Sequence, residues 1–164
     1  MIKSYRPGAT GALLDEYEKA ILELQSLISD VSDLELKEIA DPQSKDPDCK
    51  SIQTVLTHVV SSAYSYARYI SKMKRIDIIK PDLNIRETIN EYNQDLITMF
   101  AFTENIFQNV NGTELEEYDN SLKVLTTWGQ RYDIEQITEH AIVHILRHRR
   151  QIEKFKLYLR NQNE

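Results

Sequence analysis

Residues 134–159 read IEQITEHAIVHILRHRRQIEKFKLYL and carry the strongest structural signal in the chain. Their apolar members recur at intervals of three, four and seven, which is the spacing of one face of an α-helix. Asp133 and Gln136 have the spacing of a pair that caps the start of a helix. We therefore predict a long amphipathic helix here, with its apolar stripe formed by Ile134, Ile137, Ala141, Ile145, Ile152, Phe155 and Leu159.

Glycine and proline divide the remaining sequence, which contains only four of each. The segments between these breakers are rich in Leu, Ile, Glu, Lys and Gln, which favour helices. Asn84 and Glu87 have the spacing of another capping pair. Residues 112–130 are mostly polar and predict a long connection with one short extended piece. The expected helices fall within residues 11–40, 50–79, 84–111 and 131–161.

Four amphipathic helices in one chain most simply bury their apolar faces against one another. The second helix repeats the apolar pattern with Val55, Val59, Ser62, Tyr66 and Met73. We predict an all-α fold, a four-helix bundle in which residues 1–164 form a single domain. A homodimer is a reasonable expectation, because bundles often pair through an outer helix face.

Composition limits the classes of function. The net charge of −6 and the pI near 5.3 argue against nucleic acid as the main partner. No apolar run approaches the roughly eighteen residues of a membrane span, and the first ten residues lack the core of an export signal. A cytoplasmic protein that binds neither membrane nor nucleic acid is expected. The lone Cys49 has no cysteine partner and no neighbour that would lower its pKa, so no catalytic role is assigned to it.

All four histidines lie in two of the predicted helices: His58 in the second, and His140, His144 and His148 in the fourth. Residues four apart on a helix are offset by about 40° and one turn, so two such imidazoles can bind one ion. From the centre of the apolar stripe, His148 lies about 40° away, His144 about 80° and His140 about 120°. With His58 on the shoulder of its own stripe, a three-histidine metal site with an open position is predicted. The alternative is that these histidines lie on a solvated surface.

Two segments resemble the DinB/YfiT-like family. Residues 144–155, HILRHRRQIEKF, resemble the His-x-x-x-His-Arg-Gly-Gln-Ile signature in the last helix of that family. Residues 51–70, SIQTVLTHVVSSAYSYARYI, resemble its second helix, where a lone histidine follows an apolar run. The resemblance implies a four-helix bundle with a long crossover connection. It also implies one divalent metal ion, most often nickel or zinc, bound at positions that match His58, His144 and His148.

The chain departs from the signature at Arg150, which stands where the family usually has glycine. An arginine here would narrow the pocket or meet an anionic group, and a surface role is the simpler interpretation. His140 occupies a place where the family often has a histidine that is not a principal ligand.

The resemblance implies a metal-dependent enzyme that acts on a small molecule. A hydrolase with an open metal position for water is our first expectation. A thiol-dependent S-transferase that uses bacillithiol or mycothiol, and a bundle that binds metal without catalysis, are the alternatives. His140 is the candidate acid or base, and Trp128 is the candidate pocket wall, with a core-filling role as its alternative. Tyr66 is expected on the core stripe and Tyr69 nearer the histidines.

Overall fold

The computed structural model describes residues 4–81 and 84–161, and most of them are helical, which confirms the all-α class. Two short 3-10 helices, η1 (Pro47–Cys49) and η2 (Gly112–Glu114), lie in connections. A two-residue strand β1 (Val124–Leu125) pairs antiparallel with β2 (Arg131–Tyr132). The α-helices of the described residues are α1 (Gly8–Ile28), α2 (Asp33–Lys37), α3 (Ile52–Met73), α4 (Ile89–Phe107) and α5 (Ile134–Asn161).

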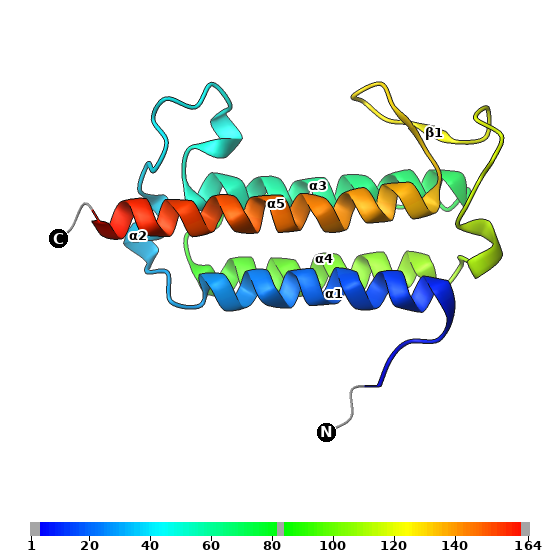
Figure 1. Ribbon diagram of the computed structural model, residues 1–164, viewed down its shortest axis with the longest axis horizontal. Helices are drawn as coiled ribbons and strands as arrows, with labels where there is room; N and C mark the ends of the chain where they lie inside the picture. Colours follow the sequence, from blue (N-terminus) through cyan, green and yellow to red (C-terminus); the bar gives the residue numbers. More distant parts are fainter. Residues whose placement is uncertain (1–3, 82–83, 162–164) are drawn as a thin grey trace.

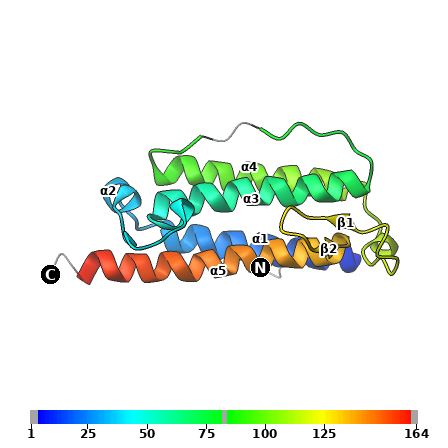
Figure 2. The same ribbon diagram turned by 90° about the horizontal axis from the view of Figure 1, so that it is seen from above.

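The four long helices lie side by side (Figure 1). Helices α4 and α5 each pack against both α1 and α3. Helices α1 and α5 run in one direction and α3 and α4 in the other, as the chain colours show (Figure 1). Because α3 and α4 are parallel, the chain must return along the helices between them. The described parts of that connection, residues 74–81 and 84–88, lie along the outside of the pair (Figure 2).

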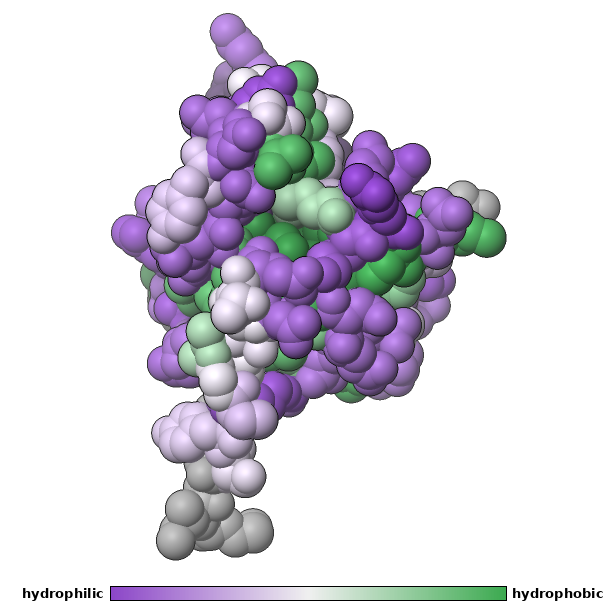
Figure 3. Space-filling view, turned by 90° about the vertical axis from the view of Figure 1, so that its right-hand side faces the viewer, coloured by the Kyte–Doolittle hydropathy of each residue, from purple (hydrophilic) through white to green (hydrophobic). Residues whose placement is uncertain are grey.

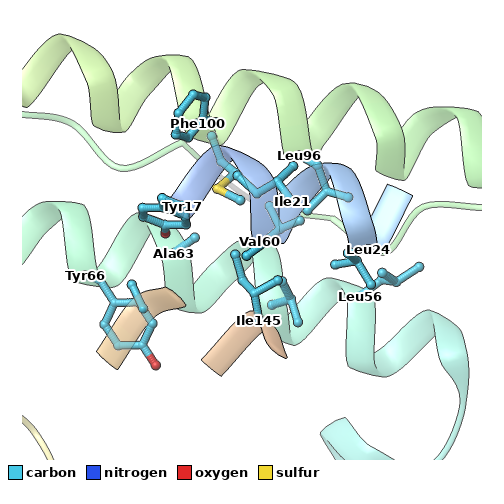
Figure 4. Close-up of a cluster of buried hydrophobic side chains, with 14 of the residues drawn as sticks. Tyr17, Ile21, Leu24, Leu56, Val60, Ala63, Tyr66, Leu96, Phe100 and Ile145 are labelled. Carbon is cyan, nitrogen blue, oxygen red and sulfur yellow. The ribbon is translucent and has the colours of Figure 1, made fainter. Parts of the chain in front are cut away.

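Each long helix contributes an apolar stripe to one core. Figure 4 shows side chains from all four helices meeting there. The rings of Tyr17 and Phe100 pack edge to face, with centroids 5.8 Å apart. Burying one large apolar side chain contributes about 1.5–3 kcal/mol, so this packing stabilises helices that would be marginal alone. Tyr66 lies at the edge of the cluster, on the side of α3 that faces α5 (Figure 4).

The start of α5 agrees with the sequence. The backbone N–H of Gln136 donates to Asp133 Oδ1 at 2.9 Å, and the Asp133 N–H donates to Gln136 Oε1 at 3.2 Å. This reciprocal pair satisfies two N–H groups that the helix cannot pair internally. The predicted Asp133–Gln136 cap is confirmed.

The predicted cap at Asn84 and Glu87 is wrong. Helix α4 begins at Ile89, where Thr88 accepts from the Glu91 N–H and the Glu91 side chain returns to the Thr88 backbone. Thr88 directly precedes a buried isoleucine, so the cap forms where the apolar stripe begins. Glu87 instead forms an ion pair with Lys37, at 2.7 Å.

The first predicted helix is also divided. Helix α1 ends at Ile28, and Ser32 with Glu35 forms a capping box that begins α2. Gly11 does not limit the helix, which starts at Gly8. A Cβ atom at Gly11 would lie 2.5 Å from the backbone of Arg6, so the missing side chain permits this close packing.

Residues 108–133 form the long connection that the sequence predicts, with the β1–β2 pair as its extended part. At this end of the molecule, hydrophilic side chains cover most of the face and apolar ones show in patches between them (Figure 3). Within the described part of the chain, none of the helices combines the length and apolarity that a membrane span requires.

Candidate metal centre

Three histidine side chains meet between α3 and α5. His58 lies on α3, and His144 and His148 lie one turn apart on α5. The Nε2 atoms of His58 and His144 are 3.1 Å apart, and one ring nitrogen from each histidine lies within 4.8 Å of the others. Two imidazoles on one tetrahedral zinc ion, with bonds of about 2.0–2.1 Å, place their nitrogens about 3.3 Å apart. The three rings are therefore close enough to hold one metal ion.

The depth of the histidines follows their angles on the helix. His148 is 3% exposed and His144 is 6% exposed. His140 is only partly buried, and the side chain of His58 is 27% exposed. The predicted order on α5, with His148 deepest and His140 outermost, is confirmed. The half-buried His58 leaves the cluster open toward a pocket on one side.

Asp48 orients the ring of His58 from the connection before α3. Its Oδ2 atom lies 3.2 Å from His58 Nδ1. When Nδ1 carries the proton and donates to this carboxylate, the Nε2 lone pair faces His144, which is the arrangement that metal-binding histidines commonly have. The turn that presents Asp48 is held by Asp46, whose Oδ1 accepts from the Asp48 N–H at 3.0 Å.

Gln151 orients the ring of His148 in the same way. His148 Nδ1 lies 2.8 Å from Gln151 Oε1, an atom that can only accept, so Nδ1 carries the proton. Nε2 of His148 is then an unprotonated acceptor. It is buried and has no hydrogen-bond partner among residues 4–81 and 84–161. A buried acceptor without a partner is costly, and a cation would supply the partner. The donor set therefore fits a divalent ion.

Burial keeps the imidazoles of His144 and His148 neutral. It is the main reason that the pKa of His144 falls from 6.5 to about 3, and the neighbouring His148 and His58 lower it further. Burial also lowers the pKa of His148, although the hydrogen bond to Gln151 opposes this shift. Metals bind the neutral imidazole, so near neutral pH both rings are in the binding form.

A pocket of about 530 Å³ opens beside His58 and His144. Trp128 lies in its wall and is 42% exposed, so it does not fill the core. The indole ring stacks on His140, with centroids 5.2 Å apart and planes 19° apart. The structure thus brings both residues to the pocket, while their roles in binding and proton transfer remain predictions.

Tyr66, and not Tyr69, faces the histidines. The Tyr66 ring centroid lies 5.3 Å from that of His140 and 5.5 Å from that of His144. Helices α3 and α5 are antiparallel, so a step forward along α3 corresponds to a step backward along α5. Tyr66 lies eight residues after His58, and it therefore reaches the level of His140, which lies eight residues before His148. The prediction for Tyr69 considered the angle on α3 alone and is wrong. The Tyr69 hydroxyl accepts from the Thr127 N–H at 2.9 Å and so anchors the wall that carries Trp128.

A second pocket, of about 770 Å³, lies on the other side of His148. Arg150 lines this pocket with an exposed side chain, beside Cys49 and Asp46. Burial raises the pKa of the Cys49 thiol, and Asp46 raises it further against the lowering effect of Gln151. The thiol therefore stays protonated near neutral pH, as the sequence led us to expect.

Sequence reasoning missed the two residues that orient the histidines. Gln151 lies three residues after His148 on α5, and this spacing makes neighbours on a helix, so the contact could have been found. Asp48 lies ten residues before His58 in a polar connection. No periodicity indicates how such a segment folds back, so the Asp48 contact could not have been found this way.

No protein-family model matches the chain, and neither a curated protein nor a solved structure matches it. The structural observations that bear on function are therefore the geometry of the three histidines and the pocket beside them.

Proposed function

We propose that this chain is a DinB/YfiT-like enzyme that binds one divalent ion, nickel or zinc, and hydrolyses a small substrate. His58, His144 and His148 would hold the ion. The observation that carries the proposal is the buried Nε2 atom of His148, which has no partner among the described residues although Gln151 fixes the proton on Nδ1.

The arrangement of the helices supports the same assignment. Helices α3 and α4 are parallel, and their connection returns along their length (Figure 2). This arrangement supports the four-helix bundle with a long crossover that the sequence resemblance implies. The three histidines also fall on the helices, α3 and α5, that correspond to the second and last helices of the family.

A divalent ion held by three neutral imidazoles would lower the pKa of a coordinated water or thiol toward neutrality. In the neutral rings, hydrogen bonds from Nδ1 to Asp48 and Gln151 leave the Nε2 lone pairs of His58 and His148 free for the ion. Burial, helped by Arg147, lowers the pKa of His140, which is therefore neutral near pH 7 and able to accept a proton at the pocket rim.

Tyr66 adds a hydrogen-bond donor to the pocket. Burial is the main reason that its pKa rises to about 12, despite a hydrogen bond with Ser62 that lowers it. The phenol therefore keeps its proton at neutral pH and can donate to an oxygen of the substrate. Trp128, which lies between the strands β1 and β2, forms one wall of the pocket.

Turnover of a panel of small esters and amides by the metal-loaded protein tests the hydrolase proposal. We expect turnover in the parent and none in His144→Ala, which loses a ligand. His140→Gln should retain the metal and lose about 10²–10⁴-fold in rate. A metal-loaded parent that turns over no member of the panel would contradict hydrolysis and favour a bundle that binds metal without catalysis.

Thiol transfer is a second candidate, and the lining of the pocket favours it. Among the described residues that line the pocket beside His58 and His144, none is a carboxylate, so hydrolysis would depend on His140 as its general base. A thiol whose pKa is lowered by a metal needs no such base. Conjugation of a small thiol to an electrophile by the metal-loaded parent, without hydrolysis of the panel, would select this function.

A further inference from the structure

The pocket beside His58 and His144 carries positive charge alone. Four basic side chains line it: Arg68 and Lys72 from α3, Lys80 from the connection after α3, and Arg147 from α5. No aspartate or glutamate is among the lining residues that the structure describes. The whole chain has 26 acidic and 20 basic residues and a net charge of −6, so this concentration of one sign opposes its overall composition.

None of these four cations forms an ion pair within residues 4–81 and 84–161. The Lys72 ammonium instead lies 5.8 Å from the centre of the Tyr69 ring. Lys80 donates to Ser61 Oγ at 3.2 Å and to Ser65 Oγ at 3.3 Å, which fixes it against α3. Lys72 and Lys80 are therefore held beside the pocket by neutral groups, and the charges of all four side chains remain available to a ligand.

Four other pockets on the protein are lined by both basic and acidic side chains. The pocket that contains Arg150 also contains Asp46, and the pocket formed by Arg149 also contains Glu23 and Glu153. The pockets around Lys74 and around Arg6 likewise include glutamates. Lys72 and Arg147 also line two of these mixed-charge pockets, whereas Arg68 and Lys80 line only the pocket beside the histidines among the five.

The like charges affect one another. Burial is the first cause of the lowered pKa of Lys80, and the charge of Arg68 is the second. Several cations around one concave space attract an anion strongly and repel one another until it binds. Arginine and lysine are also the side chains that hold carboxylate and phosphate groups.

We propose that this pocket binds a small anionic molecule, with its carboxylate or phosphate group held by Arg68, Lys72, Lys80 and Arg147. The proposal names the substrate class of the enzyme proposed above and rests on that function. His58 and His144 line the same pocket, so the anionic group positions the rest of the molecule beside the three histidines. The exposed ring of Trp128 provides the apolar wall on which that remainder packs.

Trp128 is the only tryptophan of the chain and lies in the wall of the pocket, so its fluorescence reports on binding. The experiment titrates zinc-loaded, full-length protein with succinate, with inorganic phosphate and with neutral succinamide, and repeats each titration by calorimetry. We expect saturable binding of an anion and none of succinamide. The anion that binds with the higher affinity shows whether the natural ligand carries a carboxylate or a phosphate.

The variants Arg68→Gln and Arg147→Gln should each weaken anion binding by at least about fivefold, because each removes a charged hydrogen-bond donor. Arg150→Gln is the matched control, since Arg150 is an exposed arginine on the same helix that lines the other pocket. It should bind anions as the parent does. Zinc content should be equal in the parent and all three variants.

Metal content separates the two proposals. A parent that holds zinc but binds neither anion, by fluorescence or calorimetry, would overturn the anionic substrate and leave the metal-dependent enzyme intact. Equal weakening in Arg150→Gln would also overturn it, because the effect would then be one of net charge. A parent that binds no zinc would instead contradict the proposed function. If that zinc-free parent still bound an anion, and Arg68→Gln weakened this binding, the result would support the basic pocket without the metal site.

Discussion

The two edges of the apolar stripe on α5 differ in how their polar groups are satisfied. We call one the histidine edge (His144, His148 and Gln151, facing α3) and the other the ion-pair edge (Arg149, Lys156 and Arg160, facing α1 and α2). The centres of the two edges lie about 130° apart around the helix. On the ion-pair edge every named side chain has an acidic partner: Arg149 pairs with Glu23, Lys156 with Asp30, and Arg160 with Asp30 and Glu35.

The histidine edge leaves a group without a partner. Nε2 of His148 is buried and accepts no hydrogen bond from the described residues. Ion pairs that are complete within the chain fix how α5 packs, and they need nothing from outside. An incomplete buried cluster is costly for folding alone, so it indicates a site for a ligand. The difference separates the part of α5 that holds the fold together from the part that we assign to function.

The largest expected effect is the loss of stability in acid, where the two edges should respond in different pH ranges. The pKa of His144 is about 3 in the fold and 6.5 ordinarily. The unfolded chain therefore takes up a proton that the fold does not, and stability falls as the pH drops from about 6.5 toward 3. The pKa of Asp30 is lowered from 3.8 to about 2, mainly by the hydrogen bond from Lys156, and that of Glu35 from 4.5 to about 2, mainly by the hydrogen bond from Arg160. The stability that these two carboxylates contribute to the fold is therefore lost as the pH falls below about 4.5.

Urea unfolding of the metal-free protein between pH 7 and pH 3 measures both ranges. Between pH 6.5 and pH 4.5, His144→Gln should reduce the fall in unfolding free energy with pH. Asp30→Asn should leave the pH dependence in this range unchanged. If both variants changed the pH dependence of the unfolding free energy equally above pH 5, the two edges would not differ in the way that we propose.

Metal binding should stabilise the protein through the histidine edge alone. An ion at one hundred times its dissociation constant adds about 2.7 kcal/mol, which is about 5–10 °C in Tm for a chain of this length. Thermal unfolding with and without zinc should show this shift in the parent and in Asp30→Ala. His144→Ala should show no shift, and a shift of parental size in that variant would place the ion elsewhere.

Gln151 should affect metal affinity although it is not a ligand. Gln151→Ala removes the acceptor that fixes the proton on His148, and losses of this kind weaken metal binding by about ten- to hundredfold. Competition with a chromophoric chelator measures the change. Arg149→Ala, two residues earlier on the ion-pair edge, is the control and should retain the parental affinity.

The smallest expected effect is at the ion-pair edge. Asp30→Ala leaves Lys156 and Arg160 without that partner, and both contacts are partly solvated. We expect a loss of about 1 kcal/mol in unfolding free energy, reduced at high salt, with unchanged zinc content. Loss of zinc in Asp30→Ala would show that the two edges are coupled.

The sequence predicted features that depend on helical periodicity. The stripe on α5, its Asp133–Gln136 cap and the depth order of its histidines all follow from local spacing, and the structure agrees with them. Contacts between elements were not predictable in this way. Tyr69 was wrongly placed nearer the histidines than Tyr66, because Tyr66 meets His140 on an antiparallel helix, where matching axial position decides which side chains meet.

The predicted boundaries of the helices were wrong for a related reason. Residues 11–40 contain no internal breaker strong enough to indicate the turn after Ile28, and the turn forms because Ser32 and Glu35 can cap a new helix. Asp48 was missed because its contact with His58 depends on how a polar connection folds back onto α3. Composition identifies such a connection but does not fix its path.

The metal content of tag-free protein tests the central claim most directly. After incubation with zinc or nickel and removal of free ion, elemental mass spectrometry would be applied to the parent and to His58→Ala, His144→Ala and His140→Ala. We expect about one ion per chain in the parent and in His140→Ala, and almost none in the other two variants. A parent without metal, or a His144→Ala variant that keeps it, would contradict the three-histidine site.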